Sequence, residues 1–161
     1  MQMSRGFTVV ELVVVLALLG ILSGVAISRA VGPSAFSAQL LRDFLVAELR
    51  YAQRLAALRT DVEVSLSLSP AVAGYAAQVW LDGATLNRNE VWESEAVLQL
   101  NGTALGTQLQ MTYAVDGSVA SAAWDGTGLT AGDGIVLMAV AEDVLPVCVY
   151  PEGYVARGLC R

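Results

Sequence analysis

An uncharged apolar run with one carboxylate near its start is the feature that most constrains this chain. Residues 12–27 carry no charged side chain, and the preceding residues from Phe7 to Glu11 extend the segment to 21 residues. A helix of that length spans about 30 Å, which matches the hydrocarbon core of a bilayer. A secretory signal peptide fits less well because its apolar region is usually about 7–15 residues long. The sequence therefore predicts a membrane-spanning helix over residues 7–30.

Glu11 is the residue that a plain membrane anchor does not explain. A carboxylate costs about 2.5–3.5 kcal/mol at the centre of a bilayer on insertion scales. The run contains no Lys, Arg or His that could pair with Glu11. Its partner is therefore expected from outside the run. Arg5 and Arg29 flank the segment, so a count of basic residues does not set its orientation.

The stretch Arg5-Gly6-Phe7-Thr8-Val9-Val10-Glu11-Leu12 resembles the processing site of type IV prepilins and of the pseudopilins of type II secretion. This resemblance implies that residues 1–6 are a leader and that a membrane aspartyl peptidase, the prepilin peptidase, cuts between Gly6 and Phe7. It also implies methylation of the new Phe7 N-terminus. Glu11 matches the assembly residue of the family, which pairs with the N-terminal ammonium of a neighbouring subunit.

The resemblance also implies a location and partners. The chain is expected to cross the bacterial inner membrane once, among lipids, with its globular domain in the periplasm. Assembly with other pilin or pseudopilin subunits would then place it in a filament, periplasmic or on the cell surface. The implied fold is the pilin fold, an α+β arrangement in which a long N-terminal helix packs on a C-terminal antiparallel sheet.

Residues 31–161 are predicted to form the globular domain. The stretch from Val31 to Ser34 includes Pro33, which disfavours helix at the residue before it and predicts a kink or local melting. An amphipathic helix is expected over residues 34–60, because apolar residues recur at steps of three and four. We expect this stripe to pack on the sheet: Phe36, Leu40, Phe44, Ala47, Tyr51, Leu55 and Leu58.

From Asp61 onward the apolar period changes to two, which predicts strands over residues 61–161. The first runs from Val62 to Leu68 and is expected to end at Pro70. Further strands are expected at Tyr75–Leu81, Ala96–Leu100, Gln108–Val115, Val119–Trp124, Ile135–Ala141 and Val147–Tyr150. Four Asp-Gly or Asn-Gly pairs mark turns, at residues 82, 101, 116 and 125. Polar residues 85–95 and Gly-rich residues 127–134 are expected to be loops.

The two cysteines, Cys148 and Cys160, both lie in the last fourteen residues. An even count around a Pro- and Gly-containing loop favours a disulfide and an oxidising compartment such as the periplasm over two free thiols. Because the chain has no His and no CxxC spacing, no zinc site is predicted.

Two further stretches point to a subgroup. Residues 49–56, Leu-Arg-Tyr-Ala-Gln-Arg-Leu-Ala, and the ending from Val147 to Arg157 resemble GspH/FimT-type minor pilins and pseudopilins and the MshC-like prepilins of mannose-sensitive haemagglutinin pili. This resemblance implies a minor subunit that acts in filament initiation or at the tip. A major pilin is the alternative, since major subunits share the N-terminal motif and often a C-terminal disulfide loop.

Other classes of function find little support in the composition. With neither His nor Lys, the chain lacks an ordinary catalytic triad, imidazole base or Schiff-base lysine, so no enzyme and no cofactor are predicted. Some related minor pilins bind DNA through basic residues near the C-terminus, and Arg157 and Arg161 are the candidates here. Residues 34–161 carry seven arginines against fourteen carboxylates, which opposes binding to phosphates and makes nucleic acid an unlikely partner.

Overall fold

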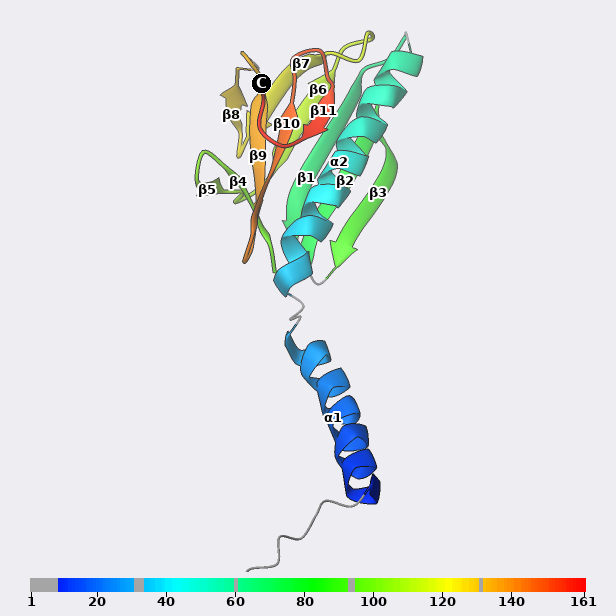
Figure 1. The fold of residues 1–161 in the computed structure, drawn as a ribbon. Coiled ribbons are helices and arrows are strands. Elements are labelled where there is room, and N and C mark those ends of the chain that lie inside the picture. The colour runs from blue at the N-terminus through cyan, green and yellow to red at the C-terminus, as the bar shows by residue number, and fades with distance from the viewer. Residues whose placement is uncertain (1–8, 31–33, 60, 93–94, 131) are drawn as a thin grey trace, which may run out of the picture. The chain divides into compact units, whose positions relative to one another are not determined.

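The computed structural model describes residues 9–30, 34–59, 61–92, 95–130 and 132–161. The chain divides into two compact units, residues 1–33 and 34–161, and each is described by itself. The first unit contains one helix, and the second contains a helix and eleven strands among its described residues. The fold class is α+β, as the sequence predicts (Figure 1).

The first unit consists of helix α1, Val9–Ala30. Its sequence is rich in Leu, Val and Ile, and its first turn holds one acidic residue, Glu11. Within the described part of the chain, no helix has the combination of length and apolarity that a membrane crossing needs. The break predicted at residues 31–33 lies outside the described residues, and helix α2 begins after it at Ser34.

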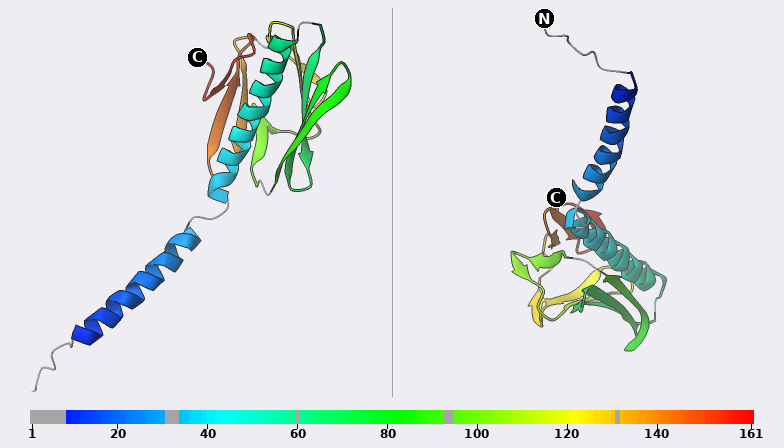
Figure 2. Two further views of the ribbon diagram at one scale, coloured as in Figure 1. Left: turned by 90° about the vertical axis from the view of Figure 1, so that its right-hand side faces the viewer. Right: turned by 90° about the horizontal axis from the view of Figure 1, so that it is seen from below.

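The second unit packs helix α2, Ser34–Leu58, across two antiparallel sheets instead of the single sheet that was predicted (Figures 1 and 2). The first sheet has the order β3-β2-β1-β6-β7-β8 and the second has the order β11-β10-β9-β4-β5. The strands are β1 Val64–Ala71, β2 Gly74–Leu81, β3 Ala84–Trp92, β4 Val97–Leu100, β5 Thr103–Ala104, β6 Leu109–Tyr113, β7 Val119–Trp124, β8 Thr127–Leu129, β9 Ile135–Val140, β10 Val144–Val149 and β11 Val155–Arg157.

Tight turns join consecutive strands where the sequence predicts them. Asp82, Asn101 and Asp125 each have φ close to 50°, and each precedes a glycine with positive φ. Two successive residues with positive φ make the type I′ turn, whose twist matches that of a two-stranded ribbon. At the fourth site the Asp116 carboxylate accepts hydrogen bonds from the backbone N and hydroxyl of Ser118, at 2.8 and 2.6 Å.

Three loop and strand-end predictions are wrong. Residues 84–92 form strand β3 rather than a loop, and residues 127–129 form the short strand β8. Both strands end a sheet and are largely exposed, so they lack the apolar alternation that marks a half-buried strand. Pro70 does not end β1, since it still pairs with Tyr75 of β2. The ladder between β1 and β6 stops at Leu68, so the missing N–H of Pro70 removes no bond on that side.

Helix α2 buries a face that overlaps only in part with the predicted one: Phe44 and Leu55 of the predicted stripe are partly buried against the core, and the other members are exposed. Phe36, Leu40, Tyr51 and Leu58 are 59%, 49%, 41% and 79% exposed. The residues that face the sheets are Ala38, Leu41, Leu45, Leu49, Ala52 and Ala56. Both sets recur at steps of three and four, so periodicity alone does not choose between them. The buried set contains three alanines, whose small side chains let the helix backbone lie close to the strands.

A disulfide joins Cys148 of β10 to Cys160, which follows β11, across twelve positions of sequence. Cys148 is fully buried, and the bridge fastens the C-terminal segment to the second sheet. A crosslink that closes a loop of this size is expected to stabilise the fold by about 3 kcal/mol, chiefly by restricting the unfolded chain.

We expect the double replacement Cys148→Ala and Cys160→Ala to lower the free energy of unfolding by about 2–4 kcal/mol. Urea denaturation of the full chain in detergent measures this difference. Wild-type protein treated with a thiol reductant is the control and should lose a similar amount. Unchanged unfolding midpoints for the variant and for the reduced protein would show that the bridge does not hold the tail.

Candidate functional site

Helix α1 presents exposed apolar side chains. From Val9 to Ile21 every described side chain is exposed, and Val9 and Val10 are 78% and 73% exposed. Burying one large apolar side chain is worth about 1.5–3 kcal/mol. An exposed apolar surface of this extent is typical of a site that contacts other apolar surfaces, in a protein or in a membrane.

Glu11 lies in the first turn of α1, within this apolar surface. A carboxylate at a helix N-terminus is favourable because the first N–H groups and the helix dipole present positive potential there. The helix thus positions one negative charge at its start, among side chains that favour a water-free environment.

The predicted cleavage residues Gly6 and Phe7, together with the predicted leader, lie outside the described residues. Phe7 precedes the first residue of α1 by only two positions. Because Phe7 and Glu11 are four residues apart, a cut after Gly6 would create an ammonium group close in sequence to the carboxylate. The role assigned to these residues remains a prediction from the sequence.

The exposed side of α2 forms a second apolar surface, which we call the outer stripe. It consists of Phe36, Leu40, Ala47, Tyr51 and Leu58, spaced by four, seven, four and seven residues. These spacings keep the side chains on one side of a helix. The outer stripe therefore runs along the full length of α2 on the side away from the sheets.

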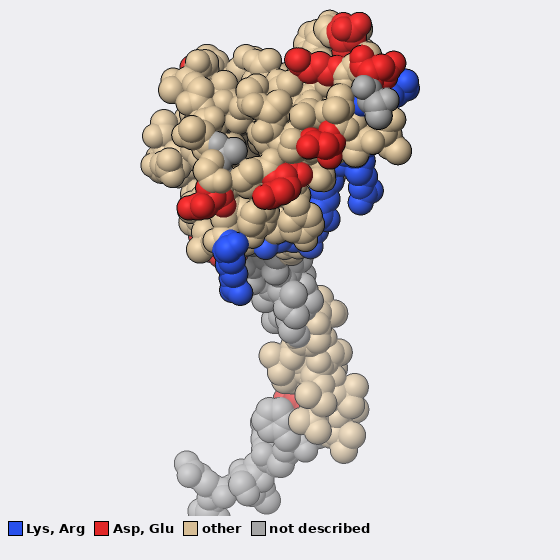
Figure 3. All heavy atoms as spheres, turned by 90° about the horizontal axis from the view of Figure 1, so that it is seen from above, with Lys and Arg blue, Asp and Glu red and all other residues tan. Residues whose placement is uncertain are grey.

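Charged residues of both signs lie in the same helix as this stripe. The described globular unit has seven arginines, and three of them lie in α2: Arg42, Arg50 and Arg54. Asp43 and Glu48 lie in the same helix, so three positive and two negative charges leave it with a net charge of +1. Figure 3 shows acidic side chains spread over one face of the molecule, with basic ones mostly along its lower rim and some at its upper right beside acidic ones.

The structure brings the two C-terminal arginines together. Arg157 and Arg161 both line an open hollow of about 380 Å³ beside Tyr150. Arg157 also lies 3.2 Å from the Asp43 carboxylate of α2. That carboxylate is shared with Arg42, at 3.1 Å, so part of the positive charge of Arg157 is already balanced.

Arg50 performs a structural role that the sequence did not reveal. Its guanidinium donates hydrogen bonds from Nη2 and Nε to the backbone O of Val155, at 2.8 and 3.2 Å. These bonds join α2 to β11 across the domain.

Asp125 also holds structure together. Its carboxylate accepts hydrogen bonds from the backbone N of Thr107, Gly106 and Gln108, at 2.6, 2.9 and 3.0 Å. The bond from Thr107, followed by that from Gly106, lowers the pKa of the Asp125 carboxyl to about 2. The Asp125 side chain therefore stabilises the loop between β5 and β6.

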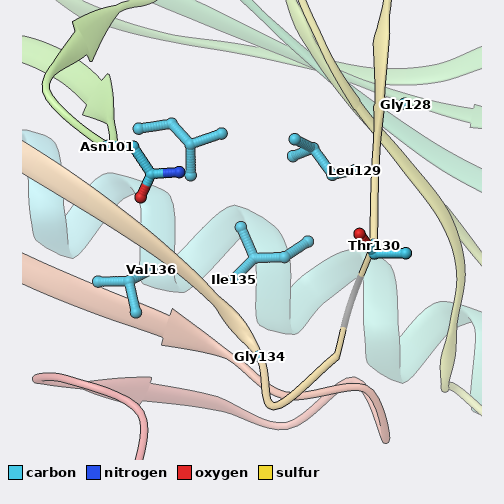
Figure 4. A pocket seen from close by; sticks show the side chains of 8 residues that line it. Asn101, Gly128, Leu129, Thr130, Gly134, Ile135 and Val136 are labelled. Carbon is cyan, nitrogen blue, oxygen red and sulfur yellow. The ribbon is translucent and has the colours of Figure 1, made fainter.

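A separate cavity of about 280 Å³ opens where the β4–β5 turn, β8 and the start of β9 meet (Figure 4). Its lining is aliphatic or backbone, apart from the polar side chains of Asn101 and Thr130. Among the described residues that line it there is no acidic side chain, no basic side chain and no cysteine.

The comparison with protein families matches residues 1–27 to the prokaryotic N-terminal methylation motif. The matched segment contains Gly6, Phe7, Glu11 and most of α1. Comparisons with curated proteins and with solved structures find no match for the chain. The motif supports a type IV pilin-like prepilin: a structural, envelope-associated subunit that prepilin peptidase processes and that assembles with other pilin subunits.

Proposed function

We propose that this chain is a minor pilin or pseudopilin, processed by prepilin peptidase and assembled into a type IV pilus-like or type II secretion filament. The N-terminal methylation motif over residues 1–27 is the observation that carries the proposal. Within it, Gly6 and Phe7 flank the cut, Phe7 becomes the methylated terminus, and Glu11 pairs with the Phe7 ammonium of a neighbouring subunit.

Two uncovered apolar surfaces support assembly. Helix α1 exposes its described side chains from Val9 to Ile21, and the outer stripe of α2 leaves Phe36 and Leu58 more than half exposed. Before assembly, we propose that residues 7–30 lie in the inner membrane with the globular domain in the periplasm. In the filament, neighbouring subunits then cover these apolar side chains, so that transfer out of the lipid does not expose them to water.

A role in filament initiation or at the tip is the finer part of the proposal, and it rests on the GspH/FimT-like stretch at residues 49–56. A major pilin would share the same N-terminus. The two differ in abundance, because a minor subunit is present at a small fraction of the copies of the major one.

DNA uptake is the weaker alternative. Arg157 is balanced in part by Asp43, and residues 34–161 carry twice as many carboxylates as arginines. Phosphate-driven binding needs several free cationic contacts and weakens steeply with salt. We therefore do not assign nucleic acid as a partner.

We expect the chain to appear in filaments sheared from the native host, and to be absent from filament fractions of a strain that lacks prepilin peptidase. Quantitative immunoblotting of sheared and membrane fractions measures both. The subunit should be far less abundant than the main filament protein. A chain that stays in the membrane fraction of both strains would contradict the proposal, and equal abundance would favour a major pilin.

A further inference from the structure

Strand β3, Ala84–Trp92, leaves a long free edge on the first sheet. It has nine residues, lies at the end of the strand order, and among the described strands pairs only with β2 (Figures 1 and 2). The other three sheet ends in the described structure are β8, β11 and β5, which have three, three and two residues. A long edge with unpaired backbone groups is a template for pairing with another strand.

The side chains of β3 show which part of the edge is regular. Trp80 pairs with Thr85 and Val79 with Asn87, so Leu86 is an extra residue in a bulge. From Asn87 to Trp92 the pairing with β2 continues without a shift. The edge therefore presents six regular residues after the bulge.

One face of this edge is exposed and carries both charge and apolar surface. The side chains of Arg88 and Glu90 are 59% and 24% exposed and lie 2.8 Å apart. Leu86 and Trp92, at the two ends of the segment, are 49% and 63% exposed. Asn89, on the opposite face, donates a hydrogen bond to the buried Glu48 of α2 at 2.6 Å, which holds β3 against the helix.

We propose that β3 pairs, antiparallel and about a two-fold axis at Asn89, with β3 of a second copy of this chain. In this register Arg88 lies opposite Glu90 of the second copy, and Glu90 lies opposite Arg88 of the second copy. Opposite charges directly across two strands are stabilising.

The charges also select this register over others. Charged residues on an edge strand commonly prevent pairing, because a partner strand sets like charges together. A two-fold axis at Arg88 or at Glu90 would place like charges opposite each other, and so would parallel pairing in register. The axis at Asn89 brings only opposite signs together.

The inference concerns a surface that the proposed function does not use. A two-fold contact joins two chains and then closes, whereas a filament grows by contacts that repeat head to tail. The pairing therefore joins two chains side by side, either before assembly or between filaments. A contact made mainly by one strand is smaller than a standard stable interface, so it is expected to be weak and dependent on concentration.

The test uses full-length protein in non-ionic detergent, with donor- and acceptor-labelled copies mixed and energy transfer measured against concentration. Arg88→Glu alone sets Glu opposite Glu twice, and Glu90→Arg alone sets Arg opposite Arg twice. We expect each variant by itself to pair at least about tenfold more weakly than wild type. A mixture of the two variants, and the double variant with both changes, should pair like wild type.

This design separates pairing from effects within one chain. Both single variants lose the Arg88–Glu90 contact of the monomer, so only contact between copies explains recovery in the mixture. Arg161→Glu, a charge reversal in the segment that follows β11 of the second sheet, is the control and should pair like wild type. Circular dichroism establishes that each variant is folded. Absence of transfer in wild type up to about 0.2 mM, or a mixture that pairs no better than its components, would overturn the proposal.

Discussion

Replacement of Glu11 by Ala is expected to leave the precursor inserted and cleaved but to reduce its incorporation into filaments by about 100-fold or more. Removing one member of a charge pair in a water-free environment costs about 3–5 kcal/mol, since the remaining charge is left without compensation. Here that charge would be the Phe7 ammonium of a neighbouring subunit. Insertion should become easier without the carboxylate, so the loss must arise in assembly. Immunoblots of sheared filaments and membranes measure the two steps separately.

Glu11→Gln is the matched control, because it retains the size and hydrogen-bonding capacity of the side chain but removes its charge. It should be as defective in assembly as the Ala variant and just as well processed. If Glu11→Gln assembles at the wild-type level, charge pairing is not the role of this residue. If neither variant is cleaved, Glu11 acts in processing instead.

Gly153→Ala is expected to lower the free energy of unfolding by about 3–5 kcal/mol, much of the stability of an ordinary domain. Gly153 has a φ of 82° in the turn between β10 and β11, and an added Cβ would overlap the carbonyl O of Gly117. Gly117 in turn packs against Gln53 of α2. The two sheets and the helix thus meet at this point, where the backbone N of Val119 donates to the O of Pro151 at 2.8 Å.

Gly102→Ala provides a matched control for backbone strain. Gly102 has a φ of 80°, nearly the same as Gly153, but an added Cβ there would meet nothing within 4 Å. Gly102→Ala should therefore lower the free energy of unfolding by only about 1–2 kcal/mol, which is the penalty for a side chain in a left-handed conformation. Thermal and urea denaturation of both variants measure the difference. Equal destabilisation would mean that the close approach to Gly117 is not a constraint on the fold.

Features that depend on neighbouring residues were predictable from the sequence. The turn at Asp82 and its counterparts at Asn101 and Asp125 follow from the tolerance of Asp, Asn and Gly for positive φ, which is a local property. The strands with one buried face were found for a similar reason. In β1, for example, Val64, Leu66 and Leu68 alternate with serines, and the structure buries the apolar set.

Features that depend on contacts between residues far apart in the sequence were not predictable in this way. Helix α2 has two apolar sets, and only the presence of two sheets decides that Leu45 is buried and Tyr51 exposed. Strand β3 is polar because it ends a sheet, a position that no local pattern records. At the candidate site, the sequence singled out Glu11 and the arginines near the C-terminus, and the roles assigned to them stay predictions. It did not show that Asp43 lies beside Arg157, because the two residues are far apart in the sequence of the globular unit.

Mass spectrometry of the N-terminal peptide, from filaments or membranes of the native host, tests the processing on which the proposed function depends. The predicted result is a mature chain that begins at Phe7 and carries one added methyl group on its terminal nitrogen. The Gly6→Leu variant should accumulate in the membrane with its leader intact. An assembled chain that still begins at Met1, or one that begins at a residue other than Phe7, would contradict prepilin processing at this site.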